Sequence, residues 1–95
     1  MKNGEIYGVL NIDTHNVIEA VIIQKHIGTD TVVVCPIVKA KNSYIYAVNM
    51  NGKQVYFDTR QLYTLKEKDL LSKVGEISDD ELKKLSDACV KTICG

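Results

Sequence analysis

The stretch that decides the fold covers residues 56–82 and reads YFDTRQLYTLKEKDLLSKVGEISDDEL. It opens like a strand, and then its pattern changes. Thr64 and Glu67 have the spacing of a capping box, in which side chains satisfy the free N–H groups at the start of a helix. Gly75 is a typical residue to end such a helix. The stretch therefore predicts a short helix over about residues 66–74.

A second helix follows the glycine. Ser78 and Glu81 repeat the capping-box spacing. Beyond them, apolar residues recur every three or four positions, so they form one stripe while charged residues occupy the opposite face. The pattern predicts a helix over roughly residues 79–93. The apolar stripe consists of Leu82, Leu85, Cys89 and Ile93.

The chain before residue 56 has the pattern of β-strands. Asn51-Gly52 lies between two strand-like runs, and both residues accept the positive φ angles of a tight hairpin turn. Two of the runs are almost continuously apolar, which is typical of strands in a closed barrel. We therefore expect a mainly β protein with C-terminal helices, built on a small barrel of roughly five to seven strands. The expected strands are Glu5–Leu10, Val17–Gln24, Thr31–Val38, Tyr44–Met50 and Lys53–Phe57.

Length and composition narrow the function classes. The 95 residues suit one domain over 1–95, and 12 basic residues balance 12 acidic ones, so net charge gives no general attraction to nucleic acid or membranes. The longest apolar run, residues 32–38, is far shorter than the roughly 20 residues of a membrane span. Three cysteines without paired spacing indicate reduced thiols and a cytoplasmic protein. The sequence suggests neither a metal site nor a cofactor.

Four short segments, in order along the chain, resemble the PemK/MazF toxins, which are small ribonucleases of bacterial toxin–antitoxin systems. The resemblance implies an SH3-like small β-barrel of the PemK/MazF/CcdB type. It also implies a homodimer formed through the barrel and the C-terminal helix, for which the apolar stripe of four residues is the interface candidate. The matching segments are Gly4–Tyr7, Val21–Gln24, Val34–Ile37 and Gln61–Leu65.

The departures from the family pattern concern catalysis. The position of the family's catalytic arginine is occupied by Ile18 or Glu19, and that of its threonine or serine by Val38. A further family arginine is replaced by Tyr63. Metal-independent cleavage through the RNA 2′-OH requires a base and a cation for the developing phosphate charge, and losing such groups typically costs about 10²–10³ each in rate. The resemblance therefore implies the fold without the catalytic residues.

Other residues are weaker candidates for a rewired site. His15 could act as a base because imidazole titrates near neutral pH, although a loop histidine is more often simply solvated. Lys39 and Lys41 could contact phosphate, or could guard a strand edge. Arg60, beside Gln61, could face bound RNA or could pair with Asp58. The RNA-binding candidates are therefore Lys39, Lys41, Arg60 and Gln61, and His15 is a weak catalytic candidate.

Three functions stay open at this point. The first is a catalytically degenerate PemK/MazF-like protein that binds single-stranded RNA, an antitoxin-like peptide or a host protein. The second is an active but atypical, metal-independent endoribonuclease toxin. The third is an SH3-like protein-interaction module of a phage or mobile element. We expect no metal-independent ribonuclease activity, because the family's catalytic side chains are missing.

Overall fold

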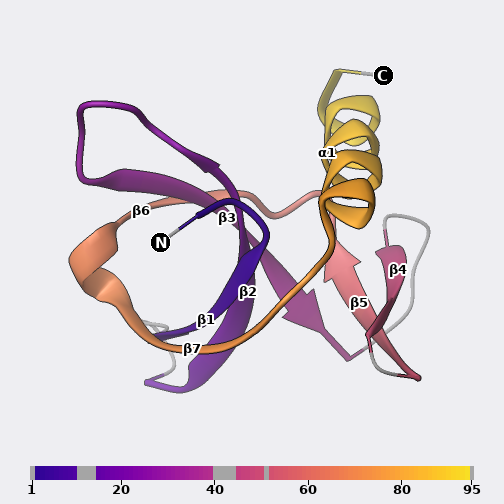
Figure 1. The fold of residues 1–95 in the computed structure, drawn as a ribbon, viewed down its shortest axis with the longest axis horizontal. Coiled ribbons are helices and arrows are strands. Elements are labelled where there is room, and N and C mark those ends of the chain that lie inside the picture. Colours follow the sequence, from indigo (N-terminus) through magenta and orange to yellow (C-terminus); the bar gives the residue numbers. More distant parts are fainter. Residues whose placement is uncertain (1, 11–14, 40–44, 51, 95) are drawn as a thin grey trace.

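The computed structural model describes residues 2–10, 15–39, 45–50 and 52–94. The chain forms an antiparallel β-barrel of strongly curved strands with one α-helix standing beside it (Figure 1). The elements are β1 (Glu5–Leu10), β2 (Val17–Lys25), β3 (Thr31–Val38), β4 (Ile45–Met50), β5 (Lys53–Asp58), β6 (Tyr63–Lys66), the 3₁₀ turn η1 (Glu67–Asp69), β7 (Leu70–Glu76) and α1 (Asp79–Cys94).

The strands are arranged around β3. The sheet has the order β4-β5-β3-β2-β1-β7, and β6 pairs with β3 beside this path. Pro36 lies on β3 between Val34, which pairs with β6, and Ile37, which pairs with β5. A proline cannot donate a hydrogen bond to a neighbouring strand, so it is placed where β3 changes partners.

The expected helix over residues 66–74 is wrong. Residues in this region form the end of β6, the single turn η1 and then β7, which pairs with β1. Thr64 lies opposite Val33 on β3, and Gly75 lies opposite Ile6 on β1. The capping signals are local, whereas the segment pairs its backbone with β1 and β3 and buries Leu70 in the second cluster of the core, so tertiary pairing overrides them.

The hairpin and the last helix confirm the sequence-based expectations. Met50 pairs with Lys53 across the turn, and Gly52 has a φ angle of +83°; Asn51 lies outside the described residues. At the start of α1, the backbone N–H of Glu81 donates to the Ser78 hydroxyl at 3.2 Å. Ser78 thus acts as the N-cap that its position predicted.

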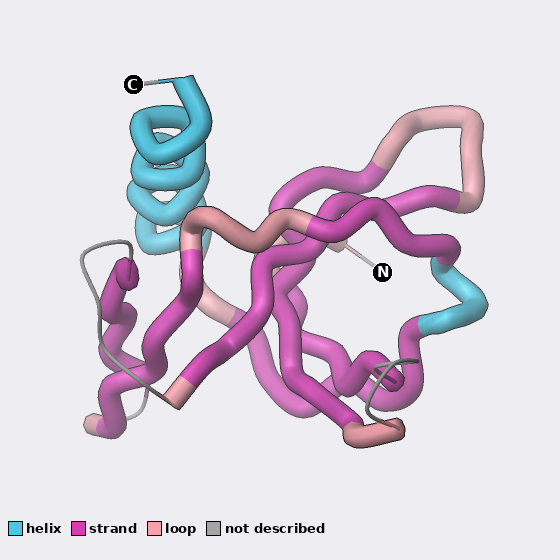
Figure 2. Tube along the Cα trace, turned by 180° about the vertical axis from the view of Figure 1, so that it is seen from behind, coloured by secondary structure: helices cyan, strands magenta, loops and turns pink. Residues whose placement is uncertain are grey.

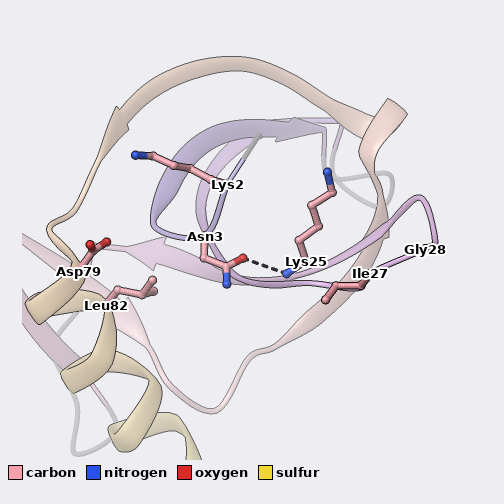
Figure 3. Close-up of a pocket in the computed structure, with 7 residues that line it drawn as sticks. All are labelled: Lys2, Asn3, Lys25, Ile27, Gly28, Asp79 and Leu82. Carbon is pink, nitrogen blue, oxygen red and sulfur yellow. Dashed lines mark hydrogen bonds between the residues drawn. The ribbon is translucent and has the colours of Figure 1, made fainter.

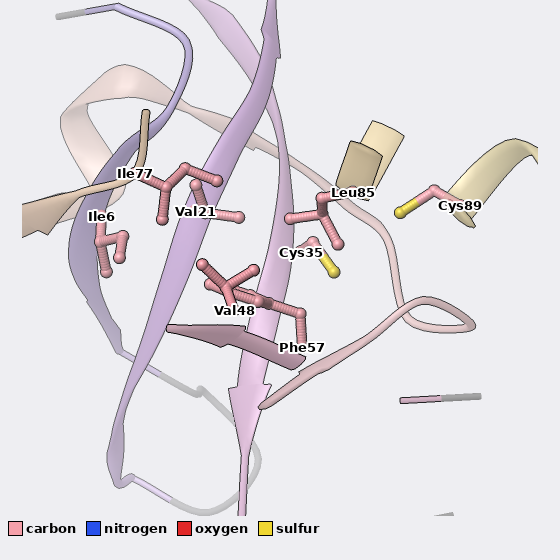
Figure 4. Close-up of a cluster of buried hydrophobic side chains, with 8 residues drawn as sticks. All are labelled: Ile6, Val21, Cys35, Val48, Phe57, Ile77, Leu85 and Cys89. Atoms are coloured by element: carbon pink, nitrogen blue, oxygen red, sulfur yellow. The ribbon is translucent and has the colours of Figure 1, made fainter. Parts of the chain in front are cut away.

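The buried side chains form two clusters, one on each side of β3. Figure 4 shows the first cluster, and Figure 2 shows from behind how the strands curl beside the helix. The first cluster lies between the sheet and α1 and includes Ile6, Val21, Cys35, Val48, Phe57, Ile77, Leu85 and Cys89. The second fills the curl of the barrel and includes Val9, Ala20, Ile22, Val32, Val34 and Leu70. Alternate residues of β3 face opposite clusters, as the pleat of a strand requires.

Candidate functional site

The positions that the resemblance assigns to catalysis lie at one end of the barrel. The paired register of β2 and β3 ends at Ala20 opposite Pro36. Beyond that point Ile18 lies opposite Val9 on β1, and Val38 lies opposite Tyr56 on β5. Ile18 packs against the second cluster, and Val38 is half-buried. This end of the barrel therefore presents two aliphatic side chains where cleavage would need a cation and a hydroxyl.

Three charged or titratable candidates from the sequence analysis, Glu19, His15 and Lys39, lie near this end. Glu19 is exposed and lies opposite Gly8 on β1, so its carboxylate would repel a phosphate. His15 precedes β2 and Lys39 follows β3, which places both at the same end of the sheet; each is exposed. His15 has a φ angle of +57°, in the left-handed region that non-glycine residues rarely adopt. Lys41 lies outside the described residues.

Arg60 and Gln61 both bind Asp58. The Asp58 carboxylate is buried, at 2% exposure, and accepts hydrogen bonds from the Arg60 backbone N–H at 3.0 Å and from its guanidinium at 3.3 and 3.4 Å. The side-chain amide of Gln61 donates to the same carboxylate at 2.9 Å. Burial raises the pKa of Asp58, but these hydrogen bonds more than offset it, so the net pKa is lowered. From the sequence, Arg60 could either contact RNA or pair with Asp58, and the structure shows the pair with Asp58.

The loop between β5 and β6 is also tied to its surroundings at both ends. The Tyr63 hydroxyl donates to the Gln61 side chain at 2.7 Å. The hydroxyls of Thr59 and Thr92 lie 2.7 Å apart, which joins the loop to the last turn of α1. These hydrogen bonds hold the loop in place, and its cationic residue, Arg60, is paired with Asp58.

A groove that the sequence analysis missed runs beside α1. It has two parts that adjoin at Asn3, with volumes of about 780 and 470 Å³. The wider part lies between the β2–β3 hairpin and the start of α1, and Figure 3 shows its walls: Lys2, Asn3, Lys25, Ile27, Gly28, Asp79 and Leu82. The narrower part is lined from α1 by Ser86, Cys89, Val90, Ile93 and Cys94, and from the opposite side by Ile23, Gln24, Val33 and Leu62.

The two parts of the groove differ in polarity. In the wider part, the Lys25 ammonium lies 3.1 Å from a Glu67 oxygen, and the Lys2 ammonium lies 3.8 Å from a Glu76 oxygen. These cations already have anionic partners. The narrower part is mostly aliphatic, and Val90 and Ile93 on its rim are 59% and 60% exposed. The groove therefore suits an apolar segment better than a phosphate backbone.

The four residues of the apolar stripe do not share one environment. Leu85 and Cys89 are buried at 0% and 3% exposure in the first cluster, and Leu82 is partly buried against it. Ile93 is the one member of the stripe with a largely exposed side chain. Because the protomer's own core already covers Leu85 and Cys89, the stripe explains how α1 packs on the sheet. A role for Ile93 at a dimer interface stays a prediction.

A cluster of charges around Glu5 was also missed. The Glu5 carboxylate lies 2.8 Å from the Lys73 ammonium and accepts hydrogen bonds from the Lys2 backbone N–H at 2.8 Å and the Tyr7 hydroxyl at 3.2 Å. The hydrogen bond from Lys73, followed by that from Lys2, lowers the pKa of Glu5 to about 2. The cluster joins β1, β7 and the N-terminal segment, and only their pairing in three dimensions brings its members together.

Two findings concern other kinds of site. Across the parts of the chain that the structure describes, no three His, Cys, Asp or Glu side chains gather as a metal ion would need. None of the described helices is both long enough and apolar enough to cross a bilayer.

By its fold, the protein belongs to the class of small antiparallel β-barrels, here with a groove lined by a helix. A family model described as "PemK-like, MazF-like toxin of type II toxin-antitoxin system" matches residues 11–93. The chain therefore belongs to the PemK/MazF-like toxin family, as the four sequence segments indicated.

The solved structures support the fold. The chain is similar to an endoribonuclease from Mycobacterial species, solved in complex with its cognate antitoxin. The TM-score is 0.83 and the sequence identity 15%, over 99% of this chain and 95% of the other. At this identity the similarity establishes the fold alone. A comparison with curated protein sequences found no match.

Proposed function

We propose that this protein is a catalytically degenerate member of the toxin family that acts by binding a protein segment in the groove beside α1. The carrying observation is the contrast between the two candidate sites. At the end of the barrel, the positions expected for catalysis hold the aliphatic residues Ile18 and Val38. The narrower part of the groove is an apolar cavity of about 470 Å³ with exposed Val90 and Ile93 at its rim.

Two arguments support the loss of cleavage. Neither Ile18 nor Val38 can accept a proton or stabilise the charge of a phosphorane, and two such losses would lower the rate by about 10⁴–10⁶ if they acted independently. Arg60, the cation next to the matching segment Gln61–Leu65, is engaged with Asp58. We therefore expect a protein that is harmless when expressed, unlike an active toxin.

A protein partner is favoured over RNA by the chemistry of the groove. Its lysines are paired with glutamates, and its narrower part is aliphatic. The similar mycobacterial structure holds an antitoxin, which supports a peptide partner of that kind here. We propose further that the chain acts as a single-domain homodimer in the cytoplasm.

Site-specific photo-crosslinking in cells tests the binding site. A photo-reactive residue at Val90 should yield one discrete cross-linked protein, whereas the same residue at exposed Lys84 on α1, outside the groove lining, should not. Cross-links from Val90 to RNA would favour nucleic-acid binding instead. Cross-links only to a second copy of the chain would assign the groove to the dimer interface. Equal labelling from both positions would contradict a specific groove.

A second candidate function, an atypical endoribonuclease, rests on His15 and Lys39 at the same end of the barrel as Ile18 and Val38. Incubating the purified protein with a long single-stranded RNA in a chelator tests it. We expect intact RNA. If the RNA is cut, His15→Ala should abolish cleavage and Cys35→Ser should not. Cleavage that survives His15→Ala, Lys39→Ala and Arg60→Ala together would place the active site elsewhere.

A further inference from the structure

Two cysteine thiols meet in the core between the sheet and the helix. Cys35 lies on β3 and Cys89 on α1, and both belong to the first cluster, at 0% and 3% exposure. Figure 4 shows the Cys89 sulfur pointing from the helix towards the cluster that contains Cys35. The two residues are far apart in the sequence, so the packing of α1 against β3 brings them together.

The surroundings give the two thiols different properties. Cys35 is sealed from solvent, and its S–H donates to the Asp58 backbone oxygen at 3.3 Å. Contact with the Cys89 thiol, together with burial, raises the pKa of Cys35, so this thiol stays protonated. Cys89 also lines the narrower part of the groove, where a small oxidant can approach it.

We propose that Cys35 and Cys89 form a modification site, at which a peroxide converts the two thiols into an intramolecular disulfide that joins β3 to α1. The Cys89 thiolate attacks the peroxide O–O bond and becomes a sulfenic acid, and with hydrogen peroxide the leaving hydroxide takes up a proton as water. The Cys35 sulfur then attacks the Cys89 sulfur, and the Cys35 S–H proton passes to the departing sulfenic hydroxyl, which leaves as a second water. The two thiols are oxidised by two electrons and the peroxide is reduced by two.

The disulfide would have a measurable structural effect. It would close a long loop between β3 and α1, and in the chain-entropy model such a cross-link restricts the unfolded chain. For a domain of this size we expect Tm to rise by roughly 5 °C or more. The inference does not depend on what the groove binds, because the mass and the Tm of the protein measure formation of the disulfide directly.

The test uses the full-length chain with the exposed third cysteine removed by Cys94→Ser. The folded protein is treated with hydrogen peroxide, and its intact mass and non-reducing peptide map are measured. We expect the loss of two hydrogens, a peptide pair that links Cys35 to Cys89, and reversal by dithiothreitol. The companion variant Cys35→Ala, also with Cys94→Ser, should gain oxygen at Cys89 instead.

Two outcomes would overturn the proposal. One is a Cys94→Ser chain that gains oxygen at Cys89 without forming the linked peptides. The other is a folded chain that keeps both thiols under peroxide, while the same chain unfolded in urea forms the disulfide. The second result would show that the folded core keeps the sulfurs apart or inaccessible.

Discussion

The buried carboxylate of Asp58 accepts hydrogen bonds from both the backbone N–H and the guanidinium of Arg60, at 3.0 Å and at 3.3–3.4 Å. Asp58 ends β5, and Arg60 lies in the loop that leads to β6. A carboxylate held in this way fixes the path of the loop as well as the direction of the cation. The pair is therefore a structural element directly before Gln61–Leu65, one of the segments that resemble the toxin family.

Asp58→Asn should destabilise the protein. It removes the charge from a buried site that accepts hydrogen bonds from Arg60 and Gln61, and such losses cost about 1–3 kcal/mol. Denaturation in urea measures the change in the free energy of unfolding. Asp87→Asn on the exposed face of α1 is the matched control, with an expected change within about 0.5 kcal/mol. Equal effects of the two substitutions would contradict a structural role for the pair.

The stability of the protein should fall in acid because of Glu5. Its pKa is lowered from 4.5 to about 2 in the folded state, so the stabilisation is fully present above pH 4.5 and disappears as the pH falls towards 2. Glu5→Gln should lower Tm at neutral pH, and its difference from the native chain should shrink across this window. Glu76→Gln, at a more exposed carboxylate, should change the pH profile less. A constant Tm difference from pH 7 to pH 2 would exclude Glu5 as the source.

Leu85→Ala should destabilise the folded protomer at any protein concentration. Leu85 is fully buried in the first cluster, and truncating such a side chain typically costs about 2–5 kcal/mol because a cavity remains. Val90→Ala, on the exposed rim of the groove, should cost far less. Urea denaturation at several protein concentrations measures both. A concentration-dependent effect of Leu85→Ala would instead place this residue at an interface between copies.

Ile93→Lys should weaken self-association without unfolding the protomer. Ile93 is 60% exposed, so a charged side chain there remains in solvent in the monomer but would be desolvated in a dimer. Equilibrium sedimentation should show the native chain as a dimer at micromolar concentration and the variant shifted towards monomer. Lys84→Ala serves as the control. A native chain that sediments only as a monomer would contradict the proposed dimer.

The sequence correctly predicted secondary structure that depends on residues close together in the chain. It failed where pairing with distant strands overrides these local signals. The hairpin at Gly52 and the helix capped by Ser78 were correct, because turn geometry and capping act within a few residues. The segment after Thr64 was read as a helix, but its pairing with β1 and β3 is invisible to a local pattern. The groove was missed for the same reason, since its walls come from β2, β3, the β5–β6 loop and α1.

The three strand partners of β3 have a consequence for how the molecule unfolds. β3 pairs with β2, β5 and β6, and it supplies Cys35 to the first cluster and Val32 and Val34 to the second. Neither cluster can open fully while β3 stays in place, and both lose a wall when it leaves. The barrel and the helix should therefore unfold in one cooperative transition, with the amide hydrogens of β3 exchanging only when the whole chain opens.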